Sequence, residues 1–127
     1  MADDVNQRGM ELRRKMFGPE GAEKRVEAAS DFIRPLEDYV TRECFGDTWN
    51  RGVLDHKTRS MITIAMLTAL GGQGGQIRNH VKGAIANGVS KDEIREILRH
   101  AAIYCGVPRS VDAFKNAESM LKEMGLE

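Results

Sequence analysis

The stretch HKTRSMITIAMLTAL, residues 56–70, decides the fold of this chain. Its apolar residues surround a helix instead of forming one stripe, which is typical of a helix that is buried on all sides. Asp55, just before it, is a suitable N-cap. One small subunit offers few elements to cover such a helix, so we expect a partner subunit to cover part of it.

Helical periodicity continues toward the C-terminus. Gly71-Gly72-Gln73-Gly74-Gly75 predicts a flexible connector. We then predict a helix that ends at Asn87-Gly88, a helix that starts with the capping box of Ser90 and Glu93 and stops at Gly106 and Pro108, and a last helix over about 110–124.

The N-terminal part also reads as helical. We predict a helix over about 5–17, ended by Gly18-Pro19, and a second from about residue 22, with Val26, Ala29, Phe32 and Ile33 at helical spacing. Pro35 is expected to break it, and a further helix should run from Leu36 towards Phe45. Residues 46–54 read as a loop. The prediction is an all-α fold, a compact bundle of about six to seven helices in a single domain over 1–127.

Composition excludes several classes of protein. The 127 residues carry 19 basic and 19 acidic side chains, which argues against a nucleic-acid binder or a polybasic membrane-surface protein. The longest strongly apolar stretch is about half a membrane span. The two cysteines, Cys44 and Cys105, suggest reduced thiols rather than a disulfide scaffold. Without a visible signal peptide, we expect a soluble, cytoplasmic protein.

His80 is the most informative candidate for chemistry. On a helical wheel it lies about 60° from Ile77 and about 40° from Ala84, at the edge of the apolar stripe. From there an imidazole can reach a semi-buried cleft, although a packed core histidine is the plainer alternative. His56 and His100 are expected in solvent. The three histidines share no metal-like spacing, so no metal is predicted.

Other candidates are two arginines and three pocket-type side chains. Arg51 and Arg59 can each clamp a carboxylate, with simple surface exposure as the alternative. Trp49 in its loop can cover a pocket or an interface. Tyr104 can present its hydroxyl to a pocket or fill the core. Cys105 is expected to be a buried, inert thiol.

Several blocks together resemble the carboxymuconolactone decarboxylase family. They are Gly46-Asp47-Thr48-Trp49-Asn50-Arg51, Thr58 to Leu67 (TRSMITIAML), His80 to Val89 (HVKGAIANGV) with Glu93-Ile94, and Ala102 to Val107-Pro108 (AIYCGVP). Their order and spacing cover the chain from about residue 10 to the C-terminus. The related alkyl hydroperoxidase D branch uses a CxxC pair, but residues 71–76 contain no cysteine, so its redox chemistry is not expected. Arg51-Gly52-Val53-Leu54 departs from the Arg-Pro-Gly-Leu that is more usual in the family.

The resemblance implies an alkyl hydroperoxidase D-like helical fold and a cofactor-free decarboxylation. The implied substrate is 4-carboxymuconolactone, a carboxylated butenolide of protocatechuate catabolism in the β-ketoadipate pathway, and the product is the β-ketoadipate enol-lactone. It makes His80 the first choice of acid or oxyanion donor, with Arg51 and Arg59 as carboxylate binders and Trp49 and Tyr104 as pocket walls. It also implies a homo-oligomer, a trimer or hexamer. Alternatives are a family member acting on another lactone or small acid, a non-catalytic oligomeric ligand-binding protein and, last, a peroxide-reducing protein.

Overall fold

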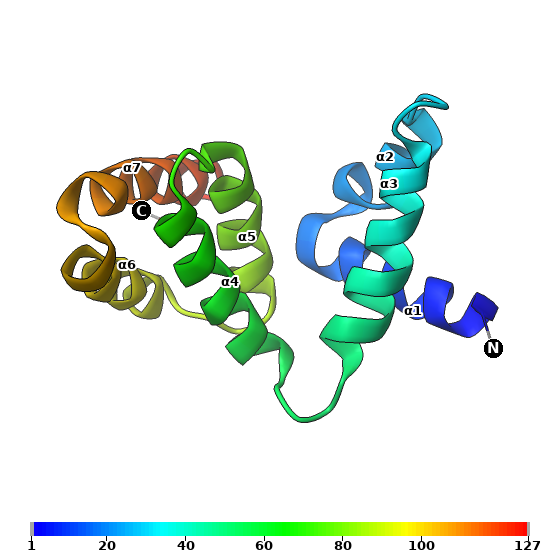
Figure 1. The fold of residues 1–127 in the computed structure, drawn as a ribbon, viewed down its shortest axis with the longest axis horizontal. Coiled ribbons are helices and arrows are strands. Elements are labelled where there is room, and N and C mark those ends of the chain that lie inside the picture. Colours follow the sequence, from blue (N-terminus) through cyan, green and yellow to red (C-terminus); the bar gives the residue numbers. More distant parts are fainter. Residues whose placement is uncertain (1, 127) are drawn as a thin grey trace. The chain divides into compact units, whose positions relative to one another are not determined.

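The computed structural model describes residues 2–126, with side chains from residue 4 onward (Figure 1). Every regular element in this part of the chain is helical, which confirms the all-α prediction. The chain divides into two compact units, Met1–His56 and Lys57–Glu127. The assignment of residues 1–127 to a single domain stays a prediction. No helix within 2–126 combines the length and apolar character needed to cross a membrane.

The N-terminal unit is built from short helices around one long helix. Its elements are α1 (Ala2–Phe17), the 3-10 helix η1 (Pro19–Gly21), α2 (Glu23–Ala28), α3 (Arg34–Tyr39), the π-helix η2 (Val40–Asp47) and the 3-10 helix η3 (Thr48–Asn50). The prediction that one helix carries Val26 through Ile33 is wrong, because α2 ends at Ala28 and Phe32 is 95% exposed. Pro35 lies in the first turn of α3 instead of breaking a helix, since a residue without an N–H suits a first helical turn.

The loop predicted at 46–54 is also partly wrong. The chain stays helical through η2 and η3 as far as Asn50, and α1 packs closely against η2. Gly9 and Gly46 permit this close approach: a Cβ on Gly9 would lie 2.9 Å from the Gly46 nitrogen and would collide with the Thr41 carbonyl oxygen. Leu12, Met16, Phe45 and Trp49 form the apolar core beside this crossing.

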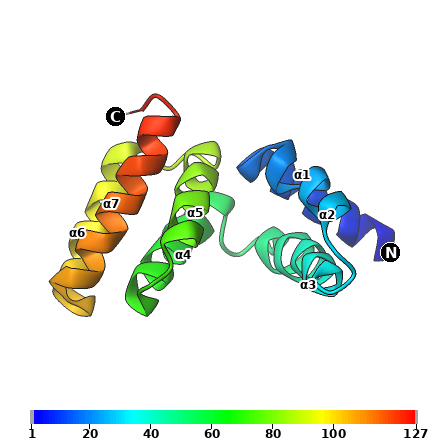
Figure 2. The same cartoon turned by 90° about the horizontal axis from the view of Figure 1, so that it is seen from above.

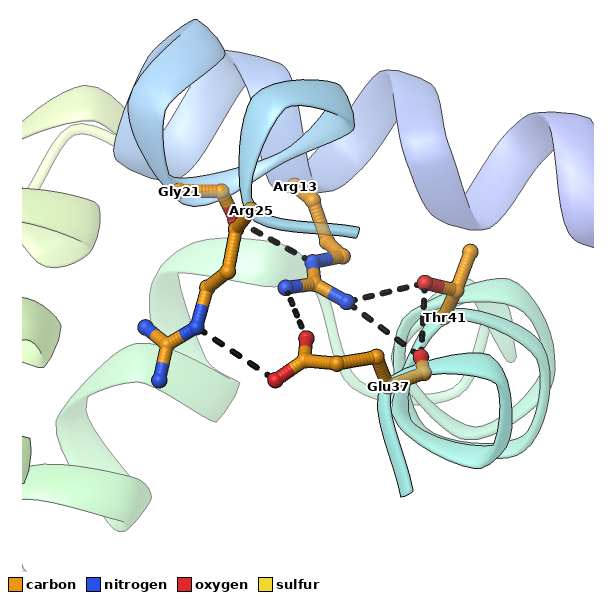
Figure 3. Close-up of polar contacts among 5 residues, drawn as sticks. All are labelled: Arg13, Gly21, Arg25, Glu37 and Thr41. Carbon is orange, nitrogen blue, oxygen red and sulfur yellow. Dashed lines mark hydrogen bonds and ion pairs between the residues drawn. The ribbon is translucent and has the colours of Figure 1, made fainter. Parts of the chain in front are cut away.

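A buried arginine joins α1 to three other elements of the N-terminal unit (Figure 3). Arg13 of α1 donates from Nη2 to Glu37 Oε1 at 2.8 Å, from Nη1 to Thr41 Oγ1 at 2.8 Å, and from Nε to the Gly21 carbonyl at 3.2 Å. Arg13 and Glu37 are 3% and 7% exposed, and Arg25 Nε lies 3.4 Å from the other carboxylate oxygen. A buried charge needs such compensation, so these contacts hold α1, η1, α3 and η2 together.

The C-terminal unit consists of α4 (His56–Leu70, less its first residue), α5 (Gly74–Ala86), α6 (Lys91–Cys105) and α7 (Val107–Glu123). The capping box of Ser90 and Glu93 at the start of α6 is confirmed, as is the end of α5 before Asn87-Gly88. Two boundaries differ from the prediction. The second Gly-Gly pair lies inside α5, and α7 begins at Val107 because Pro108 fits its first turn.

The core of the C-terminal unit is contributed by all four of its helices. In Figure 2, α6 and α7 run side by side, and α7 also packs closely against α5. Ile64, Ile77, Ile94 and Leu98 are at most 1% exposed and pack in one cluster. In the single chain one side of α4 is uncovered, because Ile62, Met66 and Leu70 are 38%, 56% and 66% exposed. A partner subunit that covers this side stays a prediction. The spacing of these three residues places them in one row along α4.

Candidate functional site

His80 lies on α5, beside the face that packs into the C-terminal core. Its neighbours Ile77, Val81 and Ala84 are buried, while His80 itself is partly buried and its Nδ1 atom is inaccessible to solvent. Burial lowers the pKa of His80 from its usual 6.5 to about 4. Desolvation disfavours the imidazolium, so the ring is neutral at neutral pH. Of the two roles that the family resemblance implies for His80, acid or oxyanion donor, the low pKa therefore favours the one that a neutral ring can fill.

Arg59 lies in the same unit as His80, near the start of α4. Its side chain is partly buried, and its carbonyl oxygen accepts a hydrogen bond of 2.8 Å from Thr63 Oγ1. The next residue, Ser60, is fully buried and accepts a 3.0 Å hydrogen bond from Asn87 Nδ2 at the end of α5. This bond ties the Arg59 end of α4 to the helix that carries His80. Sequence reasoning assigned Asn87 only to helix termination and missed this contact. The signal that could have revealed it was Ser60 itself, because a serine within an apolar helix needs a hydrogen-bond partner when it is buried.

Trp49 and Arg51 belong to the N-terminal unit. Trp49 is 6% exposed, lies in η3, and has its ring centroid 5.4 Å from that of Phe45 and 6.5 Å from that of His56. The reading of Trp49 as a loop residue is therefore wrong, and in this unit the indole is part of the core. The expectation of a solvent-exposed His56 is wrong too, since the ring is partly buried and its Nε2 lies 3.1 Å from Asn50 Oδ1.

Arg51 is exposed, at the end of the same segment. Its Nε atom lies 3.6 Å from Asp47 Oδ1. The guanidinium side chain is 68% exposed, so this ion pair is a weak, solvent-screened one. A carboxylate ligand can therefore compete with Asp47 for Arg51 at small cost.

Tyr104 lies on α6, in the C-terminal unit, and is 78% exposed. Its ring centroid is 5.0 Å from that of His100. Both residues line an open groove between α4 and α6, which we call the α4–α6 groove. Its lining residues are Met61, Ile62, Ala65, Asp92, Glu93, Glu96, Ile97, Arg99, His100, Ala101, Ile103, Tyr104 and Cys105. His80, on α5, is not among them, so the C-terminal unit does not place Tyr104 and His80 in one groove.

The two thiols lie in different units and are both partly buried. Burial raises the pKa of the Cys44 thiol, although a hydrogen bond with Trp49 opposes this shift. Such a thiol is a poor nucleophile at neutral pH. Cys105 lines the α4–α6 groove and is less buried than the sequence suggested. Among residues 4–126, no three His, Cys, Asp or Glu side chains cluster as metal ligands would.

The arrangement in the C-terminal unit suits the stabilisation of an anion. A neutral imidazole in a partly desolvated position donates an N–H hydrogen bond without carrying charge, and an arginine at the start of α4 offers a fork of N–H donors.

Known proteins similar to this chain include decarboxylases. Residues 34–119 match the model of the carboxymuconolactone decarboxylase family. The chain is 35% identical to 4-carboxymuconolactone decarboxylase of Acinetobacter baylyi, over 93% of this chain and 87% of that protein. It is also 35% identical to the nitrosuccinic acid decarboxylase npaB of Metarhizium robertsii, over 91% of this chain and 80% of that protein. The chain therefore belongs to the carboxymuconolactone decarboxylase family.

Proposed function

We propose that this protein is a cofactor-free decarboxylase of 4-carboxymuconolactone, in which His80 stabilises the oxyanion that forms as carbon dioxide leaves. The observation that carries the proposal is the neutral, partly buried imidazole of His80 on α5. The relative of Acinetobacter baylyi, by its name, acts on the same lactone.

The substrate supplies its own electron sink. In 4-carboxymuconolactone the departing carboxylate is on the ring carbon vinylogous to the lactone carbonyl. As that C–C bond breaks, its electron pair delocalises onto the carbonyl oxygen and forms a dienolate, and a proton then returns to carbon. The protein has to hold the carboxylates, stabilise the developing oxyanion and deliver the proton.

His80 suits the second of these tasks. A neutral imidazole donates an N–H hydrogen bond to the dienolate oxygen, and its partly desolvated position strengthens that bond relative to water. Because its pKa is about 4, it is not charged in the resting protein at neutral pH. Its stabilisation therefore grows as charge develops on the substrate, which is the condition for lowering the barrier.

The arginines suit the binding of the carboxylates. Arg59 lies in the same unit as His80, and Arg51 makes an exposed ion pair with Asp47. Trp49 and Tyr104 stay proposed as pocket walls. Because Trp49 is only 6% exposed, it can contact a substrate only through an edge of its indole ring. Tyr104 lines the α4–α6 groove, so it can contact a substrate only if this groove is part of the pocket.

A second substrate has equal support from sequence identity. The relative of Metarhizium robertsii is named for nitrosuccinic acid, a small acid whose nitro group offers oxygen atoms as the electron sink. The same three tasks apply: a carboxylate to bind, an anionic oxygen to stabilise and a carbon to protonate. We place it second because the resemblance in the Trp49 and Tyr104 segments points to the lactone.

Self-association completes the proposal, with the protein as a cytoplasmic homo-oligomer, a trimer or a hexamer. The row of Ile62, Met66 and Leu70 on α4 supports it, since this apolar row is exposed in one chain. We propose neither a nucleic-acid nor a membrane partner, in keeping with the zero net charge.

The experiment mixes the purified protein with freshly generated 4-carboxymuconolactone and, separately, with nitrosuccinic acid, and follows carbon dioxide release. His80→Asn should lower kcat by roughly 10²- to 10³-fold and change KM little, because an oxyanion donor acts in the transition state. His56→Asn is the control and should keep at least half of the wild-type kcat. Release from neither acid by the wild-type protein, or equal kcat in His80→Asn and wild type, contradicts the proposal.

A further inference from the structure

The outer face of α6 carries one row of exposed side chains. Asp92, Glu96, Arg99 and Ile103 follow one another at spacings of four, three and four residues, so they lie on one side of the helix. The opposite side holds the buried Ile94 and Leu98, which pack into the core of the C-terminal unit. This row therefore faces away from the chain's own core.

Beside this row lies the α4–α6 groove, whose floor is apolar. Met61, Ile62 and Ala65 line it from α4, and Ile97 and Ala101 line it from α6. Ile103 and Tyr104 stand at its edge and are 79% and 78% exposed. Apolar surface gathered in this way on one face is typical of an interaction site rather than of free surface.

Two charged residues along the groove, Glu96 and Arg99, make no ion pair within the part of the chain that the structure describes. By contrast, Asp92 is paired with Arg95 at 2.9 Å, and Glu93 is paired with Lys57 at 3.1 Å. An antiparallel second α6 that crosses the first between residues 97 and 98 would place Glu96 of each copy against Arg99 of the other. A parallel second α6 would place like charges together, which costs free energy.

We propose that the α4–α6 groove is a two-fold contact in which α6 of a second copy of this chain packs antiparallel to α6 of the first. Glu96 of each copy then faces Arg99 of the other, while the apolar groove and Ile103 supply the buried area. Such a contact is isologous, because the same surface patch serves both copies. A 15-residue helix is about 22 Å long, enough for a continuous seam of this kind.

This inference rests on the self-association proposed above and adds a constraint to it. A two-fold contact generates a dimer, or a hexamer when combined with a three-fold axis, but never a lone trimer. A monomeric protein would therefore overturn both statements. A trimer would leave the proposed function and its self-association intact and would overturn only the two-fold contact.

The test combines charge reversal with sedimentation equilibrium at micromolar concentration. The wild-type protein should give an even multiple of its 14.2 kDa chain mass. Glu96→Arg and Arg99→Glu, each alone, should raise the dissociation constant of the two-fold contact at least tenfold, roughly the effect of like charges brought together at an interface. The double variant E96R/R99E restores opposite charges across the contact and should return to within about threefold of the wild type.

The matched control is Lys115→Glu, a charge reversal at an exposed position of α7 outside the lining of the groove. It should associate as the wild type does. All positions are exposed, so circular dichroism should show an unchanged helix content in every variant. Wild-type mass after either single reversal, or a double variant as weak as the singles, overturns the proposal.

Discussion

The burial of His80 has a consequence for stability that depends on pH. In the folded protein its pKa is about 4, whereas in the unfolded chain an exposed histidine titrates near 6.5. Between these values the unfolded chain binds a proton that the folded chain does not. The contribution of neutral His80 is therefore fully present above about pH 6.5 and is lost as the pH falls toward 4. The difference between the two pKa values corresponds to about 3 kcal/mol.

The assay is urea unfolding of the wild-type protein and of His80→Asn between pH 7 and pH 4. The wild type should lose about 3 kcal/mol more of its free energy of unfolding over this range than the variant, because asparagine does not titrate. The matched control is His100→Asn, on the exposed face of α6, which should keep the wild-type pH dependence. Parallel curves for wild type and His80→Asn would refute the reasoning that burial holds this imidazole neutral.

The same pKa distinguishes two roles for His80 in decarboxylation. If the neutral ring donates a hydrogen bond, kcat should stay level from about pH 8 to pH 5 and fall only as the ring is protonated near pH 4. If the imidazolium were the working form, kcat would rise about tenfold for each unit of acidification above pH 4. A rising profile of that kind would remove the oxyanion-donor assignment.

Three further predictions concern the N-terminal unit and the thiols. Glu37→Gln should lower the free energy of unfolding by about 3–5 kcal/mol in thermal or urea denaturation, because it leaves the buried Arg13 guanidinium without its carboxylate; a loss below 1 kcal/mol would show that this ion pair contributes little. Gly9→Ala should cost about 1–3 kcal/mol, since its methyl group would collide with the η2 backbone, and unchanged stability would mean that α1 and η2 are not packed as described. Peroxide reduction should be undetectable in the wild type and in the double variant of Cys44→Ser and Cys105→Ser, and thiol-dependent turnover by the wild type would contradict this.

Several elements of the fold follow from local sequence alone. The bounds of α4 and the capping box of Ser90 and Glu93 were predicted correctly, because helical propensity and end-capping depend on residues within a few positions of each other. The region from Ala29 to Ile33 was predicted wrongly for the same reason. Its apolar spacing suits a helix, but no neighbouring element covers Phe32, so the helical pattern has no core face to bury.

The candidate site, too, could be predicted from the sequence only in part. The position of His80 at the edge of an apolar stripe was readable from a helical wheel, but its low pKa was not, since desolvation depends on which helices pack around the ring. The loop reading of residues 46–54 failed because short π and 3-10 helices are held by contacts with α1 rather than by propensity.

The sequence by itself determined the helical class, the family and the choice of His80, because these depend on residue types at fixed spacing. Only the tertiary structure decided that Arg13 and Glu37 meet in a core, that Trp49 is a core residue of the N-terminal unit, and that the outer face of α6 stays exposed. These features join residues that are far apart in the chain or depend on what covers a surface. The free energies of burial and of pairing charges that produce them exist only once the helices have packed.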